Sequence, residues 1–384
     1  MANWILAFFL GVASLASLGR PALSFGAGSD PNWTPAPAPG VFPPSPPLPT
    51  RENTGCTTDL RLDGPGSAIA LLPVRQQGPA GICTAEAAAD LVDVWSLSHR
   101  APFGFASRSH RTSHIMAAIG AASHAQRKFV GGVKFARVYD WIRTEGSCDQ
   151  AALTTASGLA INGAYQRFEG DFNAIYDSLY ESWERVNEKG ASADVVAPEV
   201  AACITRSSFL SGVLHDFREV ERALRQSTRS EFFRDLFLRA CDSHLERPHL
   251  PKLRPLELAG NSATRAIDAI FNRTVAPQPI AIGYCKKVLT NPQDFKGLPR
   301  GDAAETLEFR EDDDRCGSHY STVVGRRWNG PRRRCEYLIR NSWGQSCDAY
   351  KDSGLDCDAD KGEVWIDGWQ LNRAVFEGHH LNEE

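Results

Sequence analysis

The sequence has no marked excess of charge of either sign. Its 384 residues include 42 Lys and Arg against 46 Asp and Glu, which gives a formal net charge of −4. Binding to nucleic acid or to an anionic membrane surface usually needs a clustered basic excess, so we expect neither partner on this ground. The hydrophobic fraction of 42% and the charged fraction of 23% are typical of a globular protein with ample material for a core.

The sequence also lacks, at its N-terminal end, an apolar run long enough to span a bilayer comfortably. The run over residues 4–18 has the length of a signal-peptide core, although no Lys or Arg precedes it. We predict a signal peptide at 1–24, with cleavage after Ser24 or Ala27, and a secreted or periplasmic location. An uncleaved membrane anchor is the alternative, and only then would the membrane be a partner.

A Pro-rich linker is predicted to follow at 25–62. A segment so dense in Pro, Gly and Ser buries too little apolar area to fold. We expect folded structure to begin between Cys56 and Leu71. The predicted folded domain covers 63–376, and a short, solvated charged tail covers 377–384.

A helix is predicted to begin close to Cys83. Gly78, Pro79 and Gly81 exclude helix just before it, and apolar side chains then recur at helical spacing at positions 87, 91, 94 and 95. Cys83 therefore falls in the first helical turn, where the helix dipole stabilises a thiolate and can lower the pKa of the thiol.

Residues 150–277 are predicted to be mostly helical and contain no recognisable catalytic motif. One apolar stripe at helical spacing runs through Phe172, Ile175, Tyr176, Leu179, Tyr180, Trp183 and Val186. Further helices are predicted over 209–224 and 232–240.

Strand-like sequence returns at 279–284, 320–324 and 336–340. Asn329-Gly330 lies between the last two segments and is a strong hairpin signal. A turn centred there makes opposed residue numbers sum to roughly 660, so that His319 faces Asn341. The same register argues against a disulfide between Cys316 and Cys335.

Ten cysteines in an exported chain suggest disulfides. If Cys83 is kept for chemistry, nine remain and at least one more stays unpaired. Cys347 and Cys357 close a short loop and are the best single candidate bridge. The remaining connectivity is open.

Four segments of the chain resemble the papain/cathepsin family of cysteine peptidases. They are Gln77-Gly-Pro-Ala-Gly-Ile-Cys83; Gly131-Gly132 with Ala136, Tyr139, Gly146 and Cys148; Gly317-Ser-His319 with Val-Val-Gly325; and Asn341-Ser-Trp343-Gly. The resemblance covers about 66–150 and 277–370. It implies an α+β, two-lobed fold, with a helical lobe, an antiparallel β-rich lobe and the active site in the cleft between them.

The resemblance also implies the roles of the site residues and the reaction. Cys83 is the nucleophile, His319 the base and acid, and Asn341 the residue that orients the histidine. Gln77 and the backbone N–H of Cys83 form the oxyanion hole, and Trp343 shields the histidine–asparagine hydrogen bond. The implied reaction is peptide hydrolysis through an acyl-enzyme on Cys83, with a protein or peptide substrate and with no metal or organic cofactor.

The chain departs from the family pattern in several places. Cys83 and His319 are 236 residues apart, against roughly 130–150 in the family, so we interpret 150–277 as a helical insertion. Thr84 and Tyr320 replace an aromatic and a small residue beside the catalytic positions, and Ala80 replaces a disulfide cysteine. No helical inhibitory prosegment is recognisable. The changes affect the groove and one bridge, and they leave the reacting groups in place.

Three alternatives remain. An acyl transferase or transpeptidase would use the same triad with another nucleophile to resolve the acyl-enzyme. A catalytically silent relative would bind peptides, and a structural envelope protein would not need Cys83 at all. His110 and His114 have the i, i+4 spacing of metal ligands, but no third ligand lies nearby in the sequence, so we predict no metal site.

Overall fold

The computed structural model describes residues 56–77, 81–99, 111–124, 133–150, 165–206, 217–241, 245–258, 262–273, 277–298 and 316–381. The predicted signal peptide at 1–24 and the predicted linker up to residue 55 lie outside these ranges. Within them, no helix is both long and apolar enough to cross a bilayer.

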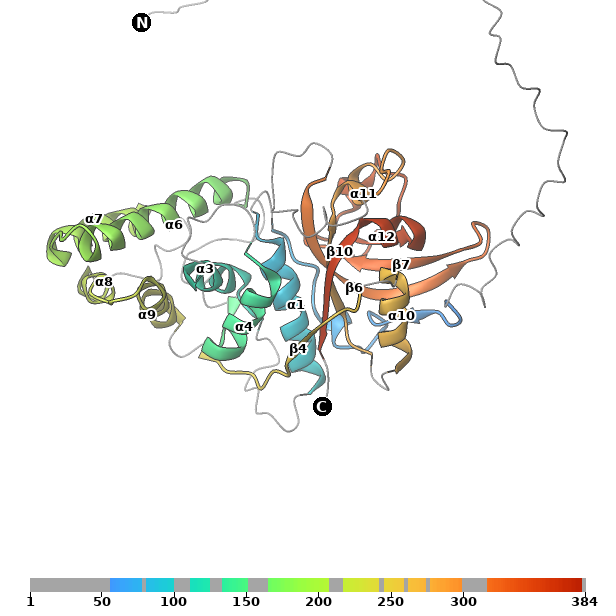
Figure 1. Cartoon of the computed structure of the whole chain (residues 1–384), viewed down its shortest axis with the longest axis horizontal. Helices are drawn as coiled ribbons and strands as arrows, with labels where there is room; N and C mark the ends of the chain where they lie inside the picture. The colour runs from blue at the N-terminus through green and yellow to red at the C-terminus, as the bar shows by residue number, and fades with distance from the viewer. Residues whose placement is uncertain are drawn as a thin grey trace, which may run out of the picture. The chain divides into compact units, whose positions relative to one another are not determined.

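An eight-stranded antiparallel sheet and a set of helices make up the described structure, and the predicted α+β class is confirmed (Figure 1). Seven strands follow the order β4-β10-β5-β6-β7-β9-β8, and β1 pairs separately with β6. The strands are β1 Leu60–Arg61, β4 Leu253–Pro255, β5 Ile280–Cys285, β6 Ser318–Asn329, β7 Arg334–Arg340, β8 Asp356–Asp358, β9 Glu363–Asp367 and β10 Val375–Leu381.

Helix α1 (Cys83–Ser98) joins the sheet to the other helices. Small and apolar side chains let it pack on several sides at once, and residues 83–96 are all buried. It packs against β5 and β6 on one side and against α3 and α4 on another. The remaining helices are α3 His114–His124, α4 Phe135–Glu145, α6 Tyr165–Asn187, α7 Ala193–Arg206, α8 Phe217–Leu224, α9 Arg229–Cys241, α10 Ala263–Arg273, α11 Lys287–Thr290 and α12 Gly368–Ala374.

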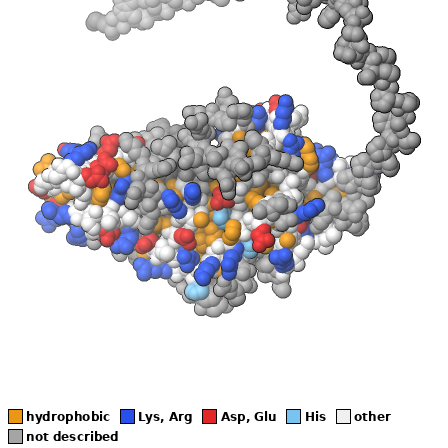
Figure 2. Space-filling model, viewed as in Figure 1, with side chains coloured by type: hydrophobic (Ala, Val, Ile, Leu, Met, Phe, Trp, Pro, Cys, Tyr) orange, Lys and Arg blue, Asp and Glu red, His pale blue; other side chains and the backbone are white. Residues whose placement is uncertain are grey.

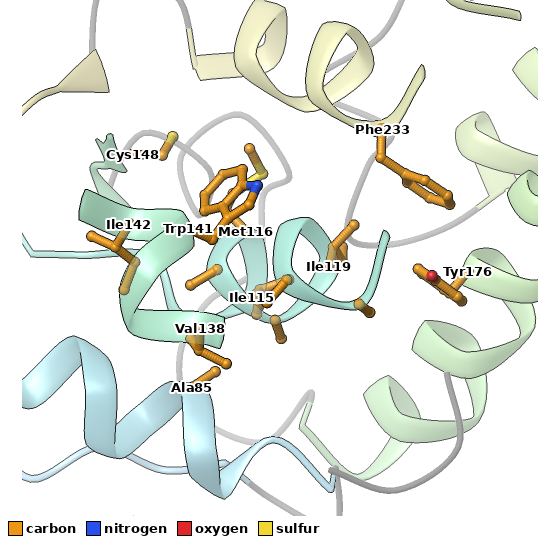
Figure 3. Close-up of a cluster of buried hydrophobic side chains, with 14 of the residues drawn as sticks. Ala85, Ile115, Met116, Ile119, Val138, Trp141, Ile142, Cys148, Tyr176 and Phe233 are labelled. Carbon is orange, nitrogen blue, oxygen red and sulfur yellow. The ribbon is translucent and has the colours of Figure 1, made fainter. Parts of the chain in front are cut away.

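Helices α6 to α9, within residues 150–277, share one hydrophobic core with α1, α3 and α4, whereas α10 packs in a second core with the sheet. Figure 3 shows Tyr176 of α6 and Phe233 of α9 beside Ile119 of α3. A disulfide between Cys148 and Cys241 ties the end of α9 to the chain after α4. The segment also supplies β4 and a short strand, β3 (Leu245–Glu246), which pairs with β2 (Ser147–Cys148). The described part of the segment is mostly helical, as predicted, and its two strands were not predicted.

The β6–β7 hairpin has a different register from the predicted one. Opposed residues sum to 662 at Thr322↔Arg340 and to 663 at Asn329↔Arg334, with a bulge between Val323 and Gly325. The predicted value of roughly 660 is wrong because the turn spans four residues, 330–333, and is not centred on Asn329-Gly330. Within this turn Arg333 has a positive φ of 50°. The bulge adds one further residue on β6.

Both predicted ends of the folded domain lie inside the sheet. β1 begins before residue 63, and Cys56 is fully buried in a disulfide with Cys335. At the other end, β10 runs between β4 and β5, and His379 is 8% exposed. The expectation of a solvated tail from residue 377 is wrong because strand pairing on both sides supports a segment whose composition alone is too polar to indicate a core strand.

Four disulfides join eight of the ten cysteines: Cys56–Cys335, Cys148–Cys241, Cys285–Cys316 and Cys347–Cys357. The predicted Cys347–Cys357 bridge is confirmed, and Cys316 and Cys335 have separate partners. Cys83 is unpaired and buried, and Cys203 is the other unpaired cysteine.

Candidate active site

Cys83 is the first residue of α1, as its glycine- and proline-bearing flank predicts. Ile82 precedes it with a non-helical ψ of 19°, and the side chain of Cys83 is 8% exposed. The backbone of Tyr320 of β6 and the first turn of its own helix, at Cys83 and Thr84, lie beside the thiol and favour its ionised form. The nucleophile candidate therefore lies where the N-terminus of α1 meets β6.

The electrostatic setting of Cys83 differs from the expected one. Burial raises the pKa of the thiol to about 11, and the neighbouring backbone groups of Tyr320 and Thr84 only partly offset this rise. The loss of solvation therefore raises the pKa of the thiol by more than the helix N-terminus lowers it. In the isolated protein the thiol form is favoured, and a base must remove its proton.

His319 lies on β6 with its side chain buried, and Asn341 follows the end of β7. His319 Nε2 and Asn341 Oδ1 are 2.6 Å apart. Extended beyond its last pair, Thr322↔Arg340, the register would place His319 opposite position 343, so Asn341 is a diagonal neighbour two residues away, within reach across a strand pair.

The surroundings of Asn341 determine which histidine nitrogen carries the proton. Asn341 Oδ1 also accepts from Ser321 Oγ at 3.0 Å and from the Ser342 backbone N–H at 2.8 Å, while Asn341 Nδ2 donates to the Tyr350 hydroxyl at 2.9 Å. Oδ1 is a carbonyl oxygen and only accepts, so His319 Nε2 must donate to it. In the neutral ring, Nδ1 is then the nitrogen that can accept a proton.

Aromatic rings enclose the His319 imidazole. The Trp343 ring centroid is 5.1 Å away, and the Tyr284 ring meets the imidazole edge-on at 5.7 Å. Trp343 stacks in turn on Tyr350. Burial lowers the pKa of His319 to about 4, with the hydrogen bond to Asn341 opposing the shift. The neutral imidazole is therefore the stable form at neutral pH.

Gln77 is held by an antiparallel contact with the segment that follows Asn341. Its backbone N–H donates to the Ser342 carbonyl at 2.8 Å, Gln76 forms a β-bridge with Trp343, and the Gly344 N–H donates to the Arg75 carbonyl at 2.9 Å. Ser342 Oγ donates to Gln77 Oε1. The amide carbonyl is thus engaged, and the NH₂ group is the end of the side chain that can donate elsewhere.

The five predicted site residues are therefore brought into one region. His319, Asn341 and Trp343 are in direct contact, and Gln77 joins them through Ser342. Cys83 is connected through the backbone of Tyr320, the residue after His319, and no hydrogen bond joins its thiol to the imidazole within the described residues.

A buried charge network behind Cys83 was missed in the sequence. Arg75 is fully buried and donates to Asp90 and Asp93 of α1 and to Gln150. Glu86 shares the same region, and its carboxyl has no hydrogen-bond partner among the described residues, although His114 Nδ1 lies 3.2 Å from Oε2. Positions 86, 90 and 93 follow the spacing of one helix face. Three acidic residues on one face of an otherwise apolar helix could therefore have indicated this network from the sequence.

The possible metal pair does not form a site in the described structure. His110 lies outside the described residues, and His114 is buried against Glu86 and Arg75. Among the described residues, no three His, Cys, Asp or Glu side chains gather into a group able to hold a metal ion.

A comparison with protein-family models finds no match, and a search of curated proteins finds none. Among the solved structures that are similar to this chain, two are given as examples, both at low identity. One comes from a study of antibody cross-reactivity between the mite allergens Blo t 1 and Der p 1, with 13% identity, a TM-score of 0.38, and coverage of 82% of this chain and 68% of that chain. The other is PepW from Lactobacillus rhamnosis, with 11% identity, a TM-score of 0.38, and coverage of 84% and 81%. TM-scores this low do not support a functional assignment.

Proposed function

We propose that this chain is a thiol-dependent peptidase that hydrolyses peptide bonds through an acyl-enzyme on Cys83. The observation that carries the proposal is the hydrogen bond from His319 Nε2 to Asn341 Oδ1, which makes Nδ1 the proton acceptor of a buried imidazole. The backbone of Tyr320, the next residue of the same strand, lies beside the thiol of Cys83. A nucleophile, a base and a residue that orients the base are thereby combined at one junction.

In the proposed reaction His319 acts as a general base. Burial disfavours both a separate thiolate and a separate imidazolium, so the thiol proton passes to Nδ1 as the sulfur attacks the peptide carbonyl carbon. The imidazolium then gives this proton to the departing amine as the carbon–nitrogen bond breaks. A water molecule, deprotonated by the same nitrogen, hydrolyses the thioester and releases the acid and the thiol.

The oxyanion that forms during attack needs two donors, and we assign them to Gln77 and to the backbone N–H of Cys83. The first N–H groups of a helix have no intrahelical acceptor, so the N–H of Cys83 is suited to this role. The contact from Ser342 to Gln77 Oε1 supports the Gln77 assignment because it fixes the amide and directs its NH₂ group elsewhere. Trp343, half-buried against the imidazole, would exclude water from the hydrogen bond to Asn341.

A cleft between two lobes, narrowed by the 150–277 helices, belongs to the same proposal. Deleting these helices is an unsuitable test because α6 to α9 share a core with α1, and the deletion would expose the apolar surface of α1. Substrates of increasing size offer a direct test: a narrowed cleft predicts that short peptides are cleaved much faster than folded proteins. Export is supported by the four disulfides, which persist in oxidising compartments.

Peptide cleavage by variants tests the assignment of the nucleophile. Cys83→Ala should abolish hydrolysis of a quenched fluorescent peptide library, whereas Cys203→Ser, the change at the other unpaired cysteine, should leave it intact. Activity that survives Cys83→Ala contradicts the proposal. A transferase using the same residues would instead give mostly amide products when an amine is added, and a silent peptide-binding relative would give no product at all.

A further inference from the structure

A pocket between β4, α10 and β10 shares no residue with the candidate active site. It has a volume of about 670 Å³, within the range of roughly 300–1,000 Å³ typical of sites for small ligands. Arg254, Arg265, Arg273 and His380 line it, with Glu257 as the single acidic residue. Figure 2 shows Lys and Arg side chains beside exposed hydrophobic side chains in the region where Figure 1 draws β4 and α10.

The charges around this pocket are unbalanced. Three guanidinium groups and a histidine face one carboxylate, and no carboxylate in the described parts of the chain forms an ion pair with Arg265 or Arg273. Like charges gathered around one cavity repel each other, and an anion between them relieves that repulsion. The pKa of His380 is lowered mainly by burial, with the backbone of Leu381 opposing the shift and the nearby Arg254, His379 and Arg273 adding to it.

Between these charged side chains, the rest of the pocket wall is apolar. Leu256 is buried, Ala266 and Ile270 are half-buried, and Pro255 and Ala269 complete this surface. A small inorganic anion would satisfy the guanidinium groups and leave the apolar wall in water. An anion with an apolar chain would satisfy both, since guanidinium groups bind carboxylates through paired hydrogen bonds.

We propose that this pocket binds a small amphipathic carboxylate, with the carboxylate on Arg265 and Arg273 and the apolar chain against Leu256 and Ile270. Both arginines lie on α10 two turns apart and are exposed, so they can converge on a ligand without loss of core packing. The site does not depend on the proposed peptidase activity.

Calorimetric titration of the full chain with octanoate tests the proposal. Acetate, inorganic phosphate and octanol are the comparison probes, because each lacks either the chain or the charge. We expect octanoate to bind at least tenfold more tightly than any of them, and the pKa of His380, followed by NMR, to rise when octanoate binds. The double variant Arg265→Gln/Arg273→Gln should weaken octanoate binding at least tenfold, whereas Arg185→Gln, at an exposed arginine of α6, should not.

Three results would overturn the proposal. Equal binding of octanol would show that charge is irrelevant. Equal binding of acetate or phosphate would show nonspecific attraction of anions. Unchanged octanoate affinity in the double variant, or an unchanged pKa of His380 at saturation, would place the ligand elsewhere.

Discussion

Arg75 Nε donates a hydrogen bond of 2.8 Å to Asp90 Oδ1 in the interior, between the strand-like segment that carries Gln77 and the helix that begins at Cys83. The backbone carbonyl of the same Arg75 accepts from Gly344. One buried arginine therefore links the segment of the oxyanion candidate, the helix of the nucleophile and the segment after Asn341.

Removing this guanidinium should destabilise the fold strongly. Arg75→Met leaves Asp90 and Asp93 buried without their main partner, and breaking a buried ion pair on one side costs about 3–5 kcal/mol. Urea unfolding followed by circular dichroism measures the loss. Arg185→Met, which removes an exposed ion pair with Glu199, is the control and should not change the midpoint measurably. Equal effects of the two variants would contradict the role assigned to Arg75.

Asn341→Ala should lower kcat/KM on the order of 10²-fold, because the His319 ring loses the acceptor that fixes its tautomer and orientation. Steady-state kinetics with a fluorogenic peptide measure the change. Ser353→Ala, which removes a buried hydroxyl that donates to the Tyr350 backbone carbonyl, is the control and should keep most of the activity. A fully active, folded Asn341→Ala variant would refute the orienting role.

The acidic limit of activity should lie well below the usual range of histidine. Burial lowers the pKa of His319 to about 4, so Nδ1 remains able to accept a proton down to that pH. The pH profile of kcat/KM should therefore fall with an apparent pKa near 4. His249→Asn, at an exposed histidine outside the site, should leave the profile unchanged. If kcat/KM of the wild type and of His249→Asn both fell with an apparent pKa near 6.5, the imidazole of His319 would be far more solvated than its position on β6 implies.

Glu86 should make stability depend on pH. Burial raises its pKa from an ordinary value of 4.5 to about 8, with Arg75 and Arg111 opposing the rise and Asp90 and Asp93 adding to it; His114 also faces the carboxyl. Between these two pH values the folded chain holds a proton that the unfolded chain has lost. The contribution of Glu86 is therefore complete below about pH 4.5 and declines as pH rises toward 8, by at most about 1.4 kcal/mol per pH unit.

Glu86→Gln removes this dependence. Urea unfolding at several pH values should show that the wild-type chain loses stability relative to Glu86→Gln between pH 5 and pH 8. Other titrating groups, including His319, are common to both chains and cancel in the difference. Asp140→Asn, at an exposed carboxylate of α4, should run parallel to the wild type. A constant difference between wild type and Glu86→Gln across this range would mean that Glu86 is ionised in the folded state.

The sequence predicts local features of the site well and the long-range ones poorly. Glycine and proline before Cys83 predict the start of α1 because those residues exclude helix. The contact between His319 and Asn341 was predicted even though the register was wrong by two to three residues, since a diagonal neighbour is still within reach.

The predictions that were wrong concern features that depend on residues distant in the sequence. The chain after residue 376 becomes a central strand only because β4 and β5 flank it. The pKa of Cys83 rises because β6 and α1 together exclude water, whereas the position of the thiol at a helix N-terminus alone predicts the opposite direction. Neither effect can be obtained from the residues of one segment.

Labelling of Cys83 by an epoxide-bearing peptide, located by mass spectrometry, tests the central claim most directly. A base at His319 Nδ1 predicts modification of Cys83 well before Cys203, at a rate that falls at least tenfold in a folded His319→Ala variant. Absence of label on Cys83, or equal rates in the two chains, would contradict the assignment of Cys83 and His319 as nucleophile and base.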